Sequence, residues 1–199
     1  MSDQFLTIVK PSEGLYKEKG SKFIAYAYPV HDEDEVKDYL EFLKKEHHNA
    51  RHYCYAFSIG HPQAYYRAND DGEPNHSAGD PILRQIQSQQ LTNVLIVVVR
   101  YFGGTKLGVS GLVNAYKTAA AEALRNTISV EKYLKEIVLF SYNYDQTNEV
   151  MKLISDFEVE IISQEFQADC QMEVKIRKSK HQSFIEGLHQ LNLRIITTS

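Results

Sequence analysis

The chain has 199 residues, a formal net charge of -4 and no tryptophan. This length can bury a substantial core, as one large domain or two small ones. The mild acidity excludes a surface that is basic throughout, as many nucleic-acid-binding proteins have. No long apolar run or leader-like segment is present, so the sequence predicts no membrane span and no signal peptide, and it indicates a cytoplasmic protein. The two cysteines, Cys54 and Cys170, are predicted to be reduced, buried thiols.

Two short strands are predicted near the N-terminus, over residues 5–9 and 22–30. The segment between them is polar and contains Gly14 and Gly20. This pattern predicts that the two strands form a hairpin joined by a polar turn.

A helix is predicted after Asp32, because apolar residues then recur at three- and four-residue steps. Residues 51–59 alternate in character and predict a strand that is covered on both faces. The loop over residues 69–81 is dense in turn-forming residues. It ends in Asp80 and Pro81, which predict a helix capped by Asp80 with proline in its first turn.

The central feature of the first domain is predicted over residues 94–116. An unbroken run of Val, Ile and Leu leads to Arg100, as expected of a strand covered on both faces. A glycine-rich loop with Lys106 follows, and a helix rich in alanine begins near Ser110.

Residues 126–132 are polar and lose this pattern, so the sequence predicts two domains, residues 1–131 and residues 132–199. The second domain has the order β-α-β-β-α-β of a ferredoxin-like domain, and the fold class is therefore α+β. Its predicted strands cover residues 135–142, 158–166, 170–177 and 193–197, its helices cover residues 145–157 and 179–191, and a short turn covers residues 167–169. Acids outnumber bases in this domain, which does not favour phosphate binding by charge.

The glycine loop resembles a phosphate cradle but fails the strict patterns. A P-loop requires lysine after its second glycine, and Val109 stands there instead. A nucleophile elbow requires a second glycine where Leu112 stands. Two interpretations remain: an anion site built by Arg100, Lys106 and loop amides, or glycines that only shape a tight turn between strand and helix.

The acidic cluster Asp70, Asp71 and Glu73 invites a metal or acid-base role. The simpler interpretation is a turn whose carboxylates cap backbone amides or pair with an arginine. The histidines have no metal-binding spacing, and neighbours such as Cys54 and His52 rarely converge as nucleophile and base. The sequence therefore predicts no metal, no cofactor and no catalytic residue.

Aromatic residues accompany basic ones at Tyr65-Tyr66-Arg67 and at Arg100-Tyr101-Phe102, as in platforms for single-stranded nucleic acid. Buried aromatic packing is the simpler interpretation. From Arg84 to Arg125 the chain is locally basic, since Glu122 is the only acid there.

Several of these segments together resemble the signature of the IMPACT family, which includes the bacterial YigZ proteins. The matching segments are Lys19-Gly20-Ser21-Lys22-Phe23, Ala50-Arg51-His52, Asp70-Asp71-Gly72-Glu73-Pro74, Ser77-Ala78-Gly79, Arg100-Tyr101-Phe102-Gly103-Gly104 and Lys106-Leu107-Gly108. The resemblance covers essentially the whole chain. Asn114 departs from it where arginine is common, and His76 and Ser110 replace usual glycines.

The resemblance implies a first domain like domain IV of elongation factor G, with the fold of a small-subunit ribosomal protein. It implies a second, ferredoxin-like domain similar to domain V of that factor. Eukaryotic relatives act in translational control by binding a regulator of the amino-acid-starvation kinase. Nucleic-acid or ribosome binding has been suggested for the bacterial relatives.

We therefore expect a non-enzymatic binding protein in translation regulation whose partner is RNA, the ribosome or a protein. The expected binding residues are Arg100, Tyr101, Gly103, Gly104, Lys106, Gly108, Asp71 and Glu73. The alternative is a small-molecule enzyme or sensor, with an anion on Lys106 and proton or metal roles for Asp71 and Glu73. A third interpretation is a protein-interaction module that docks through its second domain.

Overall fold

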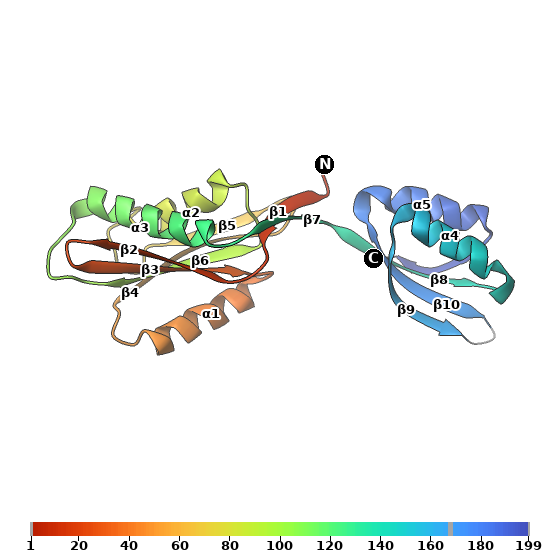
Figure 1. Ribbon diagram of the computed structural model, residues 1–199, viewed down its shortest axis with the longest axis horizontal. Helices are drawn as coiled ribbons and strands as arrows, with labels where there is room; N and C mark the ends of the chain where they lie inside the picture. The colour runs from red at the N-terminus through yellow and green to blue at the C-terminus, as the bar shows by residue number, and fades with distance from the viewer. Residues whose placement is uncertain (1, 167–168, 199) are drawn as a thin grey trace. The chain divides into compact units, whose positions relative to one another are not determined.

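A computed structural model describes residues 2–166 and 169–198, and the chain divides into two compact units (Figure 1). The larger unit is Phe5–Lys132, here called the N-terminal unit. The C-terminal unit is Tyr133–Ser199 together with Met1–Gln4. Both combine helices and strands, so the class is α+β. The start of the chain thus groups with the second unit, a long-range association that the sequence pattern did not indicate.

The N-terminal unit is built on a five-stranded sheet in which every neighbouring pair is antiparallel. Its strands, in spatial order, are β2 (Ser12–Glu18), β3 (Ser21–Pro29), β6 (Val94–Tyr101), β4 (His52–Ile59) and β5 (Tyr65–Asn69).

The predicted hairpin of residues 5–9 with residues 22–30 is wrong. Strand β3 pairs with β2, while β1 (Gln4–Ile8) pairs with β7 (Ser129–Tyr133) in a separate two-stranded sheet. The polar segment that was expected to be a turn is the edge strand β2. It reads as polar because only its Gly14 is buried and its other side chains are partly or fully exposed.

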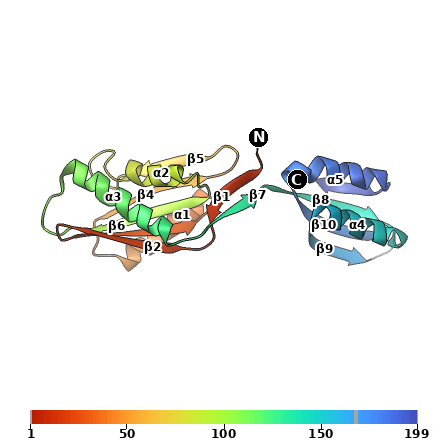
Figure 2. The same cartoon turned by 45° about the horizontal axis from the view of Figure 1, so that its top comes forward.

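Helices cover both faces of this sheet (Figure 1). Helix α1 (Glu33–Glu46) lies on one face, and α2 (Gly79–Ser88) and α3 (Gly108–Arg125) lie on the other, as the turned view also shows (Figure 2). All residues of β6 from Val94 to Arg100 are buried. This confirms that an unbroken β-branched run marks a strand covered on both faces, here in an antiparallel sheet.

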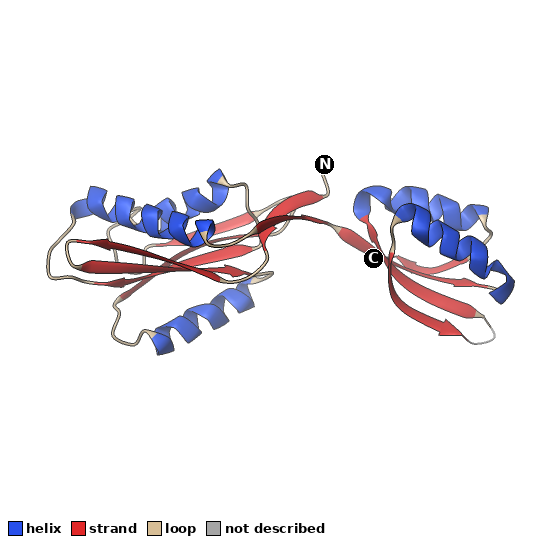
Figure 3. Ribbon diagram, viewed as in Figure 1, coloured by secondary structure: helices blue, strands red, loops and turns tan. Residues whose placement is uncertain are grey.

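The C-terminal unit has a four-stranded antiparallel sheet in the order β11-β8-β10-β9, with both helices on one face (Figure 3). Its elements are β8 (Lys135–Tyr142), the short 3-10 helix η1 (Tyr144–Gln146), α4 (Thr147–Phe157), β9 (Glu160–Phe166), β10 (Cys170–Arg177), α5 (Lys178–Gln190) and β11 (Arg194–Thr198). The turn predicted at residues 167–169 lies partly outside the described residues. Cys54 and Cys170 are free and buried, as predicted.

Asp3 ties the start of the chain to the C-terminal unit. Its carboxylate accepts hydrogen bonds from Arg177 Nε and Nη2, both at 2.8 Å, and from the Ser179 backbone N–H at 3.0 Å. Hydrogen bonds from Arg177 outweigh the opposing effect of burial and hold the pKa of Asp3 well below its ordinary value of 3.8. Because the folded pKa is lowered, this contribution to stability is present above the unfolded pKa and is lost as pH falls below it.

We expect Asp3→Asn to lower the stability of the C-terminal unit by about 2 kcal/mol near neutral pH, because charge-assisted hydrogen bonds are lost. The difference between variant and wild type should shrink as pH falls below roughly 4. Hydrogen exchange of the β8 and β10 amides would measure this. Equal protection of wild type and variant at neutral pH would contradict the expectation.

Among the described residues, no helix is both long enough and apolar enough to cross a bilayer.

Candidate functional site

A cavity of about 390 Å³ opens beside the loop that joins β6 to α3. It brings together four of the residues that the sequence singled out, Glu73, Arg100, Lys106 and Gly108. The remaining lining is Pro74, Phe102, Leu107, Val109 and Leu112. The cavity therefore combines charged groups with apolar walls at the start of α3.

Arg100 forms a buried ion pair at one wall of this cavity. Its Nη1 donates to Glu73 Oε1 at 2.6 Å, and the two residues are only 7% and 8% exposed. The guanidinium carbon also lies 5.4 Å from the Phe23 ring centroid and 5.6 Å from that of Phe102. A charge in such surroundings depends on its partner, because removing one member of a buried pair costs about 3–5 kcal/mol. Arg100 is thus a structural anchor as well as a wall of the cavity.

Tyr116 extends this buried network away from the cavity. Its hydroxyl donates to Glu73 Oε1 at 2.7 Å, and Cys54 Sγ lies 3.3 Å from the Tyr116 oxygen. Burial raises the pKa of both the Cys54 thiol and the Tyr116 phenol. A reactive cysteine needs a lowered pKa. Cys54 is therefore a protonated core residue. The hydrogen bond from Tyr116 helps to hold the Glu73 carboxylate in place.

The other two carboxylates of the acidic cluster bond to backbone. Asp70 Oδ1 accepts from the N–H groups of Ala78 and Gly79, both at 2.9 Å, and so caps helix α2 from outside. Burial raises the pKa of Asp70, but backbone hydrogen bonds led by that of Gly79 outweigh it and hold the pKa below its ordinary value. Asp71 Oδ2 accepts from the Tyr53 N–H at 2.6 Å.

The predicted cap of α2 by Asp80 is wrong. The helix begins at Gly79, its first amides bond to Asp70, and Asp80 instead pairs with His76 at 2.8 Å. The sequence could not show this, because the capping carboxylate lies eight residues or more before the amides that it binds. The acidic cluster therefore has the role given by the simpler interpretation of the sequence. Asp70 and Asp71 accept from backbone amides, and Glu73 pairs with Arg100.

Glycine is favoured in this loop for two different physical reasons. A Cβ on Gly103 would lie 1.9 Å from the Gly20 carbonyl carbon and 2.1 Å from the Ser21 nitrogen, so only glycine fits against that turn. Gly104 and Gly108 have φ of +88° and +72°, and a Cβ there would meet no atom within 4 Å. These two positions favour glycine through the left-handed backbone alone.

A second cavity, of about 360 Å³, adjoins the first through Arg100 and Phe102, which line both. Its remaining lining is Asn49, Arg51, His52 and Tyr101. No carboxylate lines it. Arg51 and Lys106 are exposed, and no ion pair involves either of them in the described part of the chain. The pair of cavities therefore carries two uncompensated cations, one lining each cavity, and the two cavities share Phe102.

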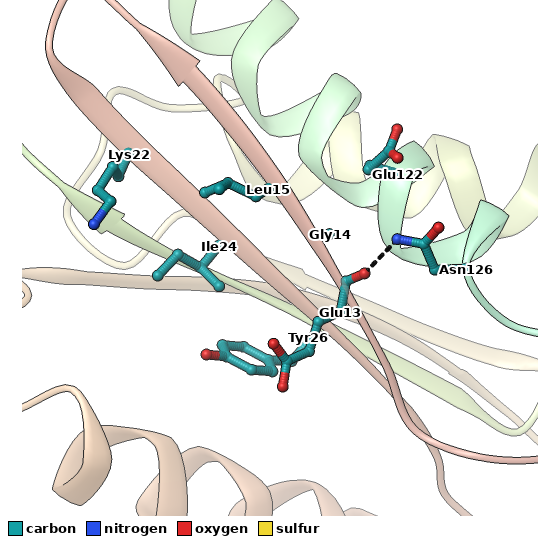
Figure 4. Close-up of a pocket in the computed structure, with 8 residues that line it drawn as sticks. All are labelled: Glu13, Gly14, Leu15, Lys22, Ile24, Tyr26, Glu122 and Asn126. Atoms are coloured by element: carbon teal, nitrogen blue, oxygen red, sulfur yellow. Dashed lines mark hydrogen bonds between the residues drawn. The ribbon is translucent and has the colours of Figure 1, made fainter.

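A larger cavity, of about 470 Å³, lies at the β2 edge of the sheet (Figure 4). Leu15 and Ile24 lie beside each other on the strands, whereas Glu122 projects from α3 and Asn126 follows its last residue. Asn126 donates to the Glu13 carbonyl at 2.8 Å. Two glutamates against the single Lys22 make this lining unsuited to an anion, despite its size.

The expectation that the aromatic residues are buried is wrong for three of them. Phe102, Tyr65 and Tyr66 are 58%, 51% and 48% exposed. Tyr101 is partly buried, and its hydroxyl bonds to His47 Nδ1 at 3.0 Å.

In residues 2–166 and 169–198 no group of three or more His, Cys, Asp and Glu could hold a metal ion.

The structure divides the predicted binding residues into groups. Glu73, Arg100, Lys106 and Gly108 line the first cavity, and Tyr101 lines the second. Gly103, Gly104 and Asp71 line neither and shape the surrounding backbone. Sequence reasoning missed Asn49 and Arg51 as parts of the site. Arg51 could have been found from the sequence, because it stands in Ala50-Arg51-His52, one of the segments that resemble the family signature.

Several known proteins are similar to this chain over most of its length. Residues 19–124 match the family described as Impact N-terminal domain. The IMPACT family member YvyE of Bacillus subtilis is 30% identical, over 96% of this chain and 88% of its own. YigZ of Escherichia coli is 32% identical over 83% of this chain and 82% of its own. A crystal structure described as a hypothetical protein is 28% identical with a TM-score of 0.73, covering 99% of this chain and 98% of its own. The chain belongs to the IMPACT family.

Proposed function

We propose that this protein acts in translation regulation as a non-enzymatic binding protein, and that it binds RNA, free or in the ribosome, through the loop between β6 and α3. The observation that carries the proposal is the pair of exposed, uncompensated cations, Arg51 and Lys106, which line two cavities that share the exposed Phe102. Cations free of carboxylates attract phosphates strongly, because no internal ion pair has to be broken first.

The start of α3 supports the same proposal. The N-cap residue, Leu107, makes no side-chain cap. Backbone N–H groups at such a helix start carry partial positive charge and favour anions. Asn114 of α3 is uncharged and donates to Tyr16 Oη at 3.4 Å. The charge of the site therefore depends on Lys106 and Arg51.

A binding role is better supported than catalysis, because the carboxylates are committed to the fold. Glu73 Oε1 accepts from both Arg100 and Tyr116, and Asp71 accepts from the Tyr53 backbone. A general base needs a carboxylate that is free to reach substrate.

We also propose finer fold assignments for the two units. The order β11-β8-β10-β9 with two helices on one face supports a ferredoxin-like assignment for the C-terminal unit. For the N-terminal unit, similarity to domain IV of elongation factor G is a proposal from the family resemblance. Such similarity is analogy and supplies no mechanism.

Lys106→Ala tests the proposal directly. We expect roughly three- to tenfold weaker binding to structured ribosomal RNA fragments, and a salt dependence reduced by about one unit of slope, because one phosphate contact is lost. Binding would be followed by fluorescence anisotropy over a range of salt concentrations. Lys44→Ala is a matched control, since it removes an exposed lysine from α1 on the opposite face of the sheet.

Equal affinity and equal salt slope for wild type and Lys106→Ala would overturn the RNA proposal. A protein partner captured from cells in a manner insensitive to nuclease would instead favour a protein-interaction module. A small-molecule sensor is the second candidate, favoured by the size and apolar walls of the 390 Å³ cavity. Thermal stabilisation by nucleotides or phosphosugars, lost in Lys106→Ala, would identify it.

A further inference from the structure

We infer that the two adjoining cavities form a site for unpaired RNA, in which one base stacks on Phe102 while the phosphates beside it contact Lys106 on one side and Arg51 on the other. The inference rests on the proposed function and narrows it from RNA in general to a single-stranded segment of at least two nucleotides. It is carried by the second cavity, which adds Asn49, Arg51 and His52 to the residues around the glycine loop.

The position of Phe102 is the first step. Its side chain lines both cavities, and at 58% exposure it presents much of its surface to solvent. The Arg100 guanidinium carbon lies 5.6 Å from its ring centroid, so a cation held by Glu73 supports the ring. An exposed aromatic ring held in place is the element on which single-stranded nucleic acids stack their bases, and stacking does not depend on sequence.

The charges are the second step. The second cavity contains Arg51 and the wall formed by Arg100, and no carboxylate lines it. Glu73, the acidic residue of the first cavity, is already paired with Arg100. Each cavity therefore offers one cation that is free to meet a phosphate. Two cations in adjoining cavities that share an aromatic ring suit consecutive phosphates of a strand whose base is turned toward the protein.

The hydrogen-bonding groups are the third step. His52 Nδ1 lies 2.8 Å from the Asp71 carbonyl oxygen, which can only accept, so Nδ1 carries the proton. In the neutral ring Nε2 is then an acceptor. Asn49, from the connection between α1 and β4, adds both a donor and an acceptor to the same cavity. These groups match the Watson–Crick edge of a base, which is accessible only in an unpaired nucleotide.

The decisive variants change the ring at Phe102. We expect Phe102→Leu to weaken binding of a short unpaired RNA by roughly fivefold or more, because stacking on an aromatic side chain is worth about 1–3 kcal/mol per base. Phe102→Trp should retain or improve affinity, since it keeps an aromatic surface. Arg51→Ala should weaken binding about as much as Lys106→Ala. Phe42→Leu is the matched control, because Phe42 is 55% exposed on α1, away from the site.

The ligands are a twelve-nucleotide unpaired RNA, the same RNA with abasic positions, and a blunt duplex of the same composition, measured by anisotropy at fixed salt. We expect the unpaired RNA to bind more tightly than the other two. Circular dichroism and thermal unfolding check that Phe102→Leu remains folded, and Phe102→Trp provides a second, independent readout of stacking.

The outcomes separate the two proposals. Weaker RNA binding in Lys106→Ala together with unchanged binding in Phe102→Leu would overturn this inference and leave the proposed function intact. Equal affinity for the duplex and the unpaired RNA would overturn it as well. If neither variant changes RNA binding, both proposals fail.

Discussion

Replacing Glu73 by alanine is expected to lower the free energy of unfolding of the N-terminal unit by about 3–5 kcal/mol, because it leaves the buried charge of Arg100 without a partner. The carboxylate also accepts from the Tyr116 hydroxyl, so a second buried polar group loses its partner. Urea unfolding followed by circular dichroism would measure the loss. Glu41→Ala, which removes an exposed acid from α1, is the control and should change stability by less than about 0.5 kcal/mol.

A double variant distinguishes loss of the pair from simple loss of packing. Replacing Arg100 by methionine and Glu73 by leucine removes both charges and keeps apolar volume. If the single variants are damaging because a charge is left unpaired, the double variant should recover most of the lost stability. A loss in Glu73→Ala of less than about 1 kcal/mol would contradict the buried-pair account.

Gly103→Ala is expected to be the second severe substitution, with a loss of about 3 kcal/mol or more, because the new methyl group would overlap backbone atoms that cannot rotate away. The nearest are the Gly20 carbonyl carbon at 1.9 Å and the Ser21 nitrogen at 2.1 Å. Relief requires moving the β2–β3 turn, which is also held by the hydrogen bond from Gly103 N to Ser21 Oγ at 3.0 Å.

Gly104→Ala is the matched control on the same loop. Its φ of +88° makes any side chain unfavourable, but no atom lies within 4 Å of the added Cβ. We expect a loss of about 1–2 kcal/mol from the backbone alone. Urea denaturation of the two variants side by side gives the order directly. A larger loss in Gly104→Ala than in Gly103→Ala would refute the close-contact explanation.

The expected losses of stability also decide how RNA binding should be tested. Arg100 is an obvious candidate for an RNA contact from the sequence, yet its alanine variant is expected to disturb the fold around Glu73 and Phe102. Lower RNA binding in that variant would have two explanations. Lys106 and Arg51 are exposed and form no ion pair with the described residues, so their variants report on binding more cleanly.

The sequence by itself determined the family, the central strand β6 and the helices that follow the acidic and glycine loops. Those features depend on local patterns: β-branched runs, helical periodicity and turn-forming residues. Edge strand β2 escaped detection because an edge strand whose side chains are only partly buried or exposed carries no clear apolar alternation.

Only the tertiary structure decided which side chains surround the glycine loop of the family signature. In the sheet Arg100 pairs with His52 of β4 and Phe23 of β3, which brings Arg51 and the α1–β4 connection beside Phe102. Strand register is set by burial across the whole sheet, so no local pattern encodes these neighbours. The same packing commits Glu73 and Asp70 to internal partners and leaves Lys106, Arg51 and Phe102 at the surface, where they can meet a ligand.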